Sequence, residues 1–237
     1  MNKTTAKTLR GIALAAGACL ACAAAAATDS LWIGGASGNW GDAGNWSGGA
    51  VPNGADATVR IESAADVTIS VGSGTYTVGA IHASGGNHTI SGTGHINLNA
   101  SSGTGVVEVA ENARLTTGCL LDAATAKGTA LAKTGLGTFA VNNKVGKTAR
   151  LNGVDVREGL FEFNGTKNTD NVDVGGLLLV RSGATAKLMV PNLFLNDTVI
   201  HTEAGGVFDA NQQNELIGAL TGEGIVTNGN GGINMTL

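Results

Sequence analysis

Three tryptophans carry the clearest chemical potential in the chain. Trp32, Trp40 and Trp46 are the only tryptophans present, and they lie close together in a stretch rich in Gly and Asn. Indole faces stack on sugar rings, which makes a glycan-binding platform one interpretation. Large apolar side chains are also needed where the last strand of a stacked fold has no neighbour to cover its core. We favour this second interpretation, in which the tryptophans cap one end of a hydrophobic core.

Residues of the types that bind metals are present, but too few of them lie together to coordinate an ion. Asp42 and Asp56 lie in glycine-containing turns and offer oxygen ligands, but Ca²⁺ takes roughly six to eight of them, so we expect turn-stabilising carboxylates. His82 and His88 would share one face of a continuous strand, which makes a metal pair conceivable. Glycines interrupt that stretch, however, so we expect these histidines and His95 to face solvent. We therefore predict no metal site.

The sequence also lacks the surroundings typical of a catalytic nucleophile or a nucleotide-binding loop. Cys119 is followed by two leucines, a setting typical of an inert buried thiol, and it is the one cysteine beyond residue 27, which rules out an internal disulfide there. The Gly-x-Gly pairs lack the strand-then-helix context of a dinucleotide site, and no Lys-Ser/Thr of a phosphate loop follows Gly135 and Gly137. We predict no cofactor.

The acidic residues form pairs on separate segments: Glu108 and Glu111, Asp155 and Glu158, and Asp170 and Asp173. Only Arg157 lies beside one of these pairs. Carboxylates must converge in space to share catalytic work, so this scatter predicts that the protein is not an enzyme. If Asp155, Arg157 and Asp173 met in one cleft, a polysaccharide lyase would be favoured instead.

The first 27 residues have the pattern of a secretory signal peptide. Lys3, Lys7 and Arg10 precede an apolar run, and alanines then offer Ala-x-Ala cleavage sites. We expect an exported protein that is extracellular, at the cell surface or periplasmic, with no membrane span in the mature chain. The formal net charge of −4 makes nucleic acid a poor partner.

The elements that position these residues are short strands. The chain holds 38 Gly and only 2 Pro. Four segments read apolar, any residue, apolar, Asn: 96–99, 139–142, 161–164 and 208–211. Together with a recurring Gly-x-Gly signature, they predict a unit of about 22 residues, which is too short for a strand plus a crossover helix and fits one coil of a parallel β-helix.

The predicted fold is therefore all-β: a right-handed parallel β-helix of about eight coils. Residues 28–60 form its Trp-rich N-terminal cap, and residues 61–237 form the coils. Because strands alternate between two faces, we expect Phe139, Val141, Phe161 and Phe163 to point inward on adjacent coils and form apolar ladders.

Residues 128–142, with the run Lys133-Thr-Gly-x-Gly-Thr-Phe139, followed by residues 154–165, resemble the autotransporter-associated β-strand repeat. Residues 32–56 are similar to the opening module that often precedes such repeats in exported bacterial proteins. The resemblance implies a surface-displayed or secreted passenger-type β-helix. The stretch after Gly231 lacks the alternating strands of a membrane barrel, so we expect a fragment of an autotransporter or a short relative exported by another route.

Two functions follow as expectations. The first is an exported, non-catalytic stalk, adhesin-like or surface-display protein, with host or cell-surface glycans or proteins as partners. The alternative is a polysaccharide-binding or polysaccharide-lyase-like β-helix protein, because the fold alone does not decide function.

Overall fold

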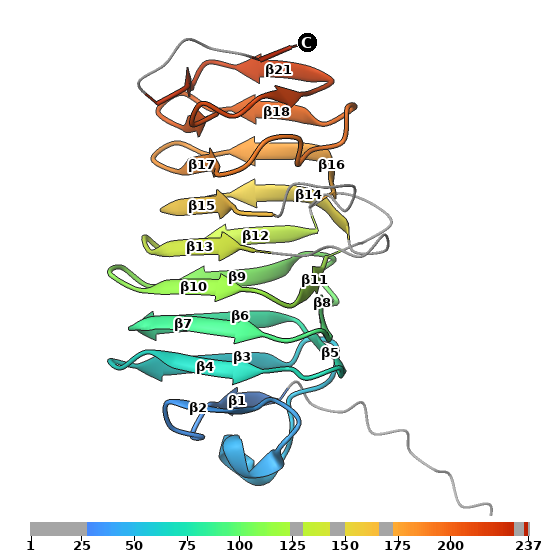
Figure 1. Cartoon of the computed structure of the whole chain (residues 1–237), viewed down its shortest axis with the longest axis vertical. Coiled ribbons are helices and arrows are strands. Elements are labelled where there is room, and N and C mark those ends of the chain that lie inside the picture. The colour runs from blue at the N-terminus through green and yellow to red at the C-terminus, as the bar shows by residue number, and fades with distance from the viewer. Residues whose placement is uncertain (1–27, 124–129, 143–149, 166–172, 230–234, 237) are drawn as a thin grey trace, which may run out of the picture.

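The protein is an all-β parallel solenoid with almost no helix (Figure 1). The computed structural model describes residues 28–123, 130–142, 150–165, 173–229 and 235–236. The predicted signal peptide and parts of the predicted repeat, at 128–129 and 143–149, lie outside these residues. No helix in the described ranges is both long enough and apolar enough to cross a membrane.

Two nine-stranded parallel sheets run the length of the solenoid. The first sheet contains, in spatial order, β1 (Asp29–Leu31), β3 (Thr58–Ser63), β6 (Ala80–Gly85), β9 (Gly105–Val109), β12 (Leu131–Thr134), β14 (Arg150–Val156), β16 (Asp173–Val180), β18 (Val199–Thr202) and β21 (Ala219–Gly222). The second sheet contains β2 (Ser37–Asn39), β4 (Val67–Ser70), β7 (Asn87–Ser91), β10 (Arg114–Thr117), β13 (Thr138–Val141), β15 (Leu160–Phe163), β17 (Thr185–Leu188), β19 (Val207–Asp209) and β22 (Ile225–Thr227).

Smaller elements complete the described chain. A third sheet of three strands is formed by β5 (Thr75–Val78), β8 (His95–Leu98) and β11 (Leu120–Asp122), and β20 (Glu215–Leu216) pairs with β23 (Met235–Thr236). Two short 3₁₀ turns, η1 (Ala43–Asn45) and η2 (Ser47–Gly49), lie near the N-terminal end. Each winding of the chain thus adds one strand to the first sheet and one to the second.

The core is a set of inward-facing ladders, as the alternating pattern predicts. Phe139 pairs in register with Phe161, and Val141 with Phe163. All four side chains are fully buried, and the Phe139 and Phe161 rings meet edge to face at 5.1 Å. The predicted inward orientation of these residues is confirmed. Such stacking buries the same face of every strand, so the apolar alternation is required on each winding.

One part of the predicted lattice was wrong. The segments at Phe139, Phe161 and Phe208 do occupy equivalent places on the second sheet, with Ala186 between the last two. The segment that begins at Ile96 instead belongs to β8 on the third sheet. The same apolar alternation is needed on every face of a solenoid, so the local pattern does not reveal which face a strand joins.

Glycine allows the corner between the first and second sheets to pack closely. Gly135 has φ +75°, and a Cβ atom there would lie 2.2 Å from the carbonyl oxygen of Val109 on the preceding winding. Gly159, the glycine at the same corner of the next winding, has φ +64° and would place a Cβ 2.6 Å from the carbonyl oxygen of Gly135. Only a residue without a side chain satisfies both restrictions.

Candidate functional site

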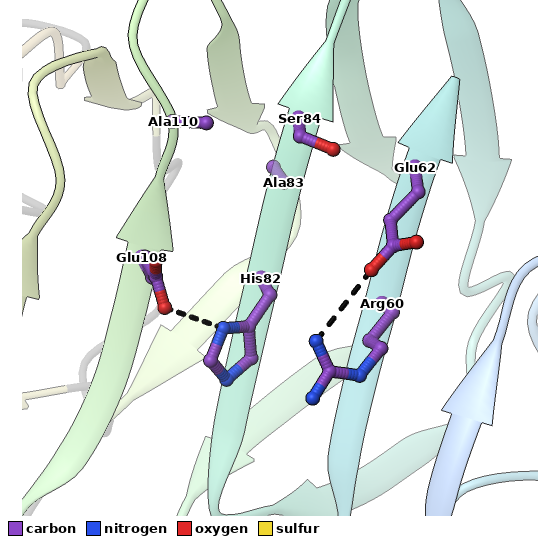
Figure 2. Close-up of a pocket in the computed structure, with 7 residues that line it drawn as sticks. All are labelled: Arg60, Glu62, His82, Ala83, Ser84, Glu108 and Ala110. Atoms are coloured by element: carbon purple, nitrogen blue, oxygen red, sulfur yellow. Dashed lines mark ion pairs between the residues drawn. The ribbon is translucent and has the colours of Figure 1, made fainter.

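A hollow of about 290 Å³ lies on the outer face of the first sheet (Figure 2). Its lining comes from β3, β6 and β9 and the residue after β9: Arg60, Glu62, His82, Ala83, Ser84, Glu108 and Ala110. We call this the first-sheet groove. Its residues are far apart in sequence, and only the winding of the chain brings them together.

Strand register explains the order of side chains in the groove. Arg60 pairs with His82 and His82 with Glu108, so one row of outward side chains crosses three strands. Glu62 pairs with Ser84 in the next outward row. Rows on one face are separated by two residues, about 6.6 Å, and neighbouring strands by about 4.8 Å. The groove is therefore a small grid of polar groups at fixed spacing.

Two ion pairs of Arg60 and one contact between His82 and Glu108 organise this grid. His82 Nδ1 lies 2.6 Å from a Glu108 carboxylate oxygen, with side chains 26% and 48% exposed. Arg60 donates from Nε to Asp29 at 2.8 Å, and its Nη1 lies 3.5 Å from Glu62 (Figure 2 draws the Glu62 contact). The hydrogen bond with Asp29 and its negative charge raise the pKa of Arg60. Three carboxylates thus surround one guanidinium and one imidazole, and the groove has an excess of negative charge.

The other predicted histidines do not join His82. His82, His88 and His95 lie on β6, β7 and β8, which belong to three different sheets, so the shared face considered from their spacing does not exist. His95 Nδ1 is 3.6 Å from Asp122. The expectation that His88 faces solvent was wrong: its side chain is buried among the inward residues, its Nε2 lies 2.9 Å from the carbonyl oxygen of Ser84, and Nδ1 has no partner among the described residues.

A second charged cluster forms farther along the first sheet. Asp155, buried, accepts hydrogen bonds from Arg157 at 2.8 Å and from Arg181 at 2.9 Å, and Arg181 also reaches Glu203 at 2.7 Å. Burial raises the pKa of Asp155, but the hydrogen bonds from Arg181 and Arg157 outweigh it and the net pKa is lowered. The charges in this cluster compensate one another, which is typical of a structural ion-pair network.

The arrangement that would favour a lyase, with Asp155, Arg157 and Asp173 in one cleft, is only partly assembled here. Asp155 and Arg157 do lie together, but the backbone of Asp173 pairs with Arg150, whereas Asp155 pairs with Leu179 farther along the same two strands. The side chain of Asp173 lies outside the described residues, as does Asp170. Sequence reasoning missed Arg181 and Glu203 because they come from later windings.

The three tryptophans form one buried cluster. Trp32, Trp40 and Trp46 are 6%, 0% and 1% exposed, and Trp46 meets both others edge to face with ring centroids 5.0 Å apart. Each indole N–H donates to a backbone carbonyl oxygen: Trp32 to Gly35, Trp40 to Pro52 and Trp46 to Trp40. A glycan platform needs an exposed indole face, and these faces are covered.

Asp42 and Cys119 have the structural roles that the sequence favoured, whereas the carboxylate of Asp56 bonds a residue 45 positions later in the chain and not its own turn. Asp42 accepts a hydrogen bond from the Gly44 amide at 2.9 Å, and Asp56 accepts one from the Ser101 amide at 2.6 Å. Cys119 is buried, and burial raises the pKa of its thiol to about 12. Within the ranges that the structure describes, no three His, Cys, Asp or Glu side chains gather as a metal site would require.

Lys133 is an unexpected inward residue. It pairs in register with the core residues Val107 and Val156, and it is fully buried. Its ammonium donates to the carbonyl oxygens of Gly135, Gly137 (2.8 Å) and Glu158 (3.0 Å). Burial lowers its pKa to about 8. The signal for this role was the Lys-Thr-Gly-x-Gly run, which places a lysine directly before the glycine corner.

Comparisons with models of known protein families, with curated proteins and with solved structures find no match to this chain. The resemblance to the autotransporter-associated repeat therefore stays a prediction.

Proposed function

We propose that the protein is an exported, non-catalytic solenoid that acts as a stalk or adhesin-like rod at the cell surface. The observation that carries this proposal is the pair of parallel sheets that continue through nine strands each, with ion pairs between successive windings on the outside. Such a rod presents flat polar faces of fixed spacing, which suits repeated weak contacts with glycans or proteins. The signal-like segment at residues 1–27 supports export.

The proposal includes the finer architecture. Right-handed connections are the rule for parallel strands joined by crossovers, so we propose a right-handed solenoid of about eight coils. The indoles of Trp32, Trp40 and Trp46 support the proposed assignment of residues 28–60 as the N-terminal cap, since all three belong to the buried hydrophobic core. Passenger-type display, as the repeat resemblance implies, is part of the same proposal.

Export and attachment can be tested in one experiment. The full chain and a variant lacking residues 1–27 are expressed in a Gram-negative host with a C-terminal epitope, and surface protein is measured by antibody binding to intact cells. We expect the full chain outside the inner membrane, and beads coated with the purified protein to adhere to glycan-bearing cells. Equal retention of both forms in the cytoplasm, or beads that adhere no better than albumin-coated ones, would contradict the proposal.

A polysaccharide-active protein is the second candidate. The His82–Glu108 pair favours it, because a carboxylate that holds an imidazole in one orientation is a common arrangement for a general base. We expect no turnover of neutral or acidic polysaccharides by the purified protein. Release of reducing or unsaturated sugars that His82→Phe abolishes would establish this candidate instead.

A further inference from the structure

The first-sheet groove combines hydrogen-bond donors and acceptors in one hollow. In the neutral His82 ring, when Nδ1–H donates to Glu108, the other ring nitrogen, Nε2, is an acceptor. Figure 2 shows this nitrogen at the same end of the groove as the terminal guanidinium nitrogen of Arg60 that does not face Glu62. Because Arg60 and His82 pair in register, a donor and an acceptor lie side by side on neighbouring strands.

A hydroxyl group matches this pair, since it can accept from a guanidinium and donate to an imidazole at the same time. The next row adds the carboxylate of Glu62 and the hydroxyl of Ser84, both outward on the same strands. The groove therefore offers matched sites for several hydroxyl groups over an area of about 5 by 7 Å.

Charge selects among hydroxyl-rich ligands. Asp29, Glu62 and Glu108 carry negative charge around the single guanidinium of Arg60, which Asp29 already engages through two contacts of 2.8 and 3.0 Å. An anionic sugar would meet this excess of carboxylates, and repulsion of like charges disfavours it.

We propose that the first-sheet groove is a binding site for neutral saccharides, with His82 and Arg60 holding one sugar hydroxyl and Glu62 contacting the next. This inference rests on the proposed attachment function and names its ligand class. Affinity should be modest, with a Kd on the order of 1 mM for one short chain, because the hollow is shallow and lacks an aromatic ring for stacking. Repeated contacts along many copies of the rod would then raise avidity.

The test is a titration of the purified full chain with cellohexaose and maltohexaose as neutral probes and hexagalacturonate as the anionic probe, followed by calorimetry and by the NMR signals of the histidine rings. We expect at least one neutral probe to bind and to shift the His82 ring signals of the wild-type protein. His82→Ala should weaken binding roughly tenfold, as loss of one hydrogen bond in a polar site does.

His95→Ala is the matched control, because His95 is also a partly exposed histidine beside a carboxylate but lies on the third sheet. It should leave binding unchanged, and both variants should melt near the wild type. Tighter binding of hexagalacturonate, no binding of either neutral probe, or equal effects of the two variants would overturn the inference. If the wild-type protein attaches to cells but neither neutral probe binds it, the groove assignment fails and the attachment function stands. If the probes bind but the protein is not exported, only the attachment function fails.

Discussion

At the scale of single residues, a buried polar side chain forms hydrogen bonds that join neighbouring windings. Lys133 occupies a position that the ladder reserves for apolar residues, between Val107 and Val156. Its ammonium satisfies three carbonyl oxygens at the corner between the two long sheets, from residues on two windings. The Gly137 oxygen also accepts from the Leu160 amide, so the lysine matters most as the donor to Gly135 and Glu158. A buried carbonyl group that loses its donor costs roughly 1–3 kcal/mol.

Replacing Lys133 by Met tests this role. Lys133→Met keeps the apolar stem but removes the donor, so we expect the free energy of unfolding to fall by about 3 kcal/mol in chemical denaturation. A fall of less than about 0.5 kcal/mol would mean that the carbonyl groups find other donors and that the lysine is dispensable.

The effect of Lys133→Met on the free energy of unfolding should also depend on pH. The pKa of Lys133 is about 8 in the folded protein, against about 10.4 for an unfolded lysine. Between these values the unfolded chain binds more protons, so this residue makes the free energy of unfolding rise with pH. The raised pKa of Cys119 acts in the opposite direction, but equally in both proteins. We therefore expect the difference between wild type and Lys133→Met to grow from pH 8 to 10 and to be flat below pH 7.

His88 is a buried polar residue that is expected to lower the free energy of unfolding. It stands in register between Val67 and Leu115, and its buried Nδ1 has no partner in the described part of the chain. We expect His88→Leu to raise the free energy of unfolding by about 1 kcal/mol, because removal of an unsatisfied polar atom outweighs loss of the bond to Ser84. His95→Leu, on the outside of β8, should change it by less than about 0.5 kcal/mol. A destabilised His88→Leu would show that Nδ1 is satisfied in solution.

At the scale of elements, the corners matter as much as the strands. Both long sheets consist of strands of three to eight residues between corners, so each turn must bring the chain back into register within a few residues. Glycines with positive φ do this at Gly135 and Gly159, where backbone from the preceding winding leaves no room for a side chain. The corner and the Lys133 ammonium are thus parts of one packing arrangement.

Alanine substitutions at two glycines of similar φ distinguish the free-energy cost of a positive φ from the cost of a steric clash. Gly135 and Gly183 have φ +75° and +79°, but a Cβ at Gly183 would meet nothing within 4 Å. We expect Gly183→Ala to cost about 1–2 kcal/mol, the price of the left-handed conformation alone. Gly135→Ala should cost at least about 2 kcal/mol more in thermal or chemical unfolding, since the Val109 carbonyl group must move. Equal losses would contradict the close approach at this corner.

At the scale of the whole molecule, the solenoid is a stack of windings (Figure 1). Each strand in the middle of a long sheet pairs with a strand on either side, whereas a strand at the end of the sheet pairs with only one. Side-chain hydrogen bonds join neighbouring windings: the Asn87 amide donates to Asp66, 21 residues earlier, and Arg181 donates to Asp155, 26 residues earlier. Near the N-terminal end, the three tryptophans are buried in one cluster, and the ring centroids of Trp40 and Tyr76 lie 5.7 Å apart.

Deletion of residues 28–56 tests the proposed cap. Without it, the apolar faces of β3 and β4 and the unpaired edges of both long sheets are exposed, so we expect the truncated chain to aggregate in size-exclusion chromatography. A chain shortened instead by residues 235–237 should stay soluble and serves as the control. A truncated chain that is monomeric and unfolds cooperatively would show that residues 28–56 do not cap the core.

By itself, the sequence determined the fold class and which strand positions face the core. Alternation, abundant glycine and scarce proline predicted a parallel solenoid, and the inward positions of Phe139, Val141, Phe161 and Phe163 followed from the same alternation. Only the tertiary structure decided which side chains meet. Every face of a solenoid needs the same alternation, and the turns between strands differ in length, so register between windings is not encoded locally. For this reason His82 meets Glu108, His88 turns inward and Arg181 joins Asp155, although no short stretch of sequence shows it.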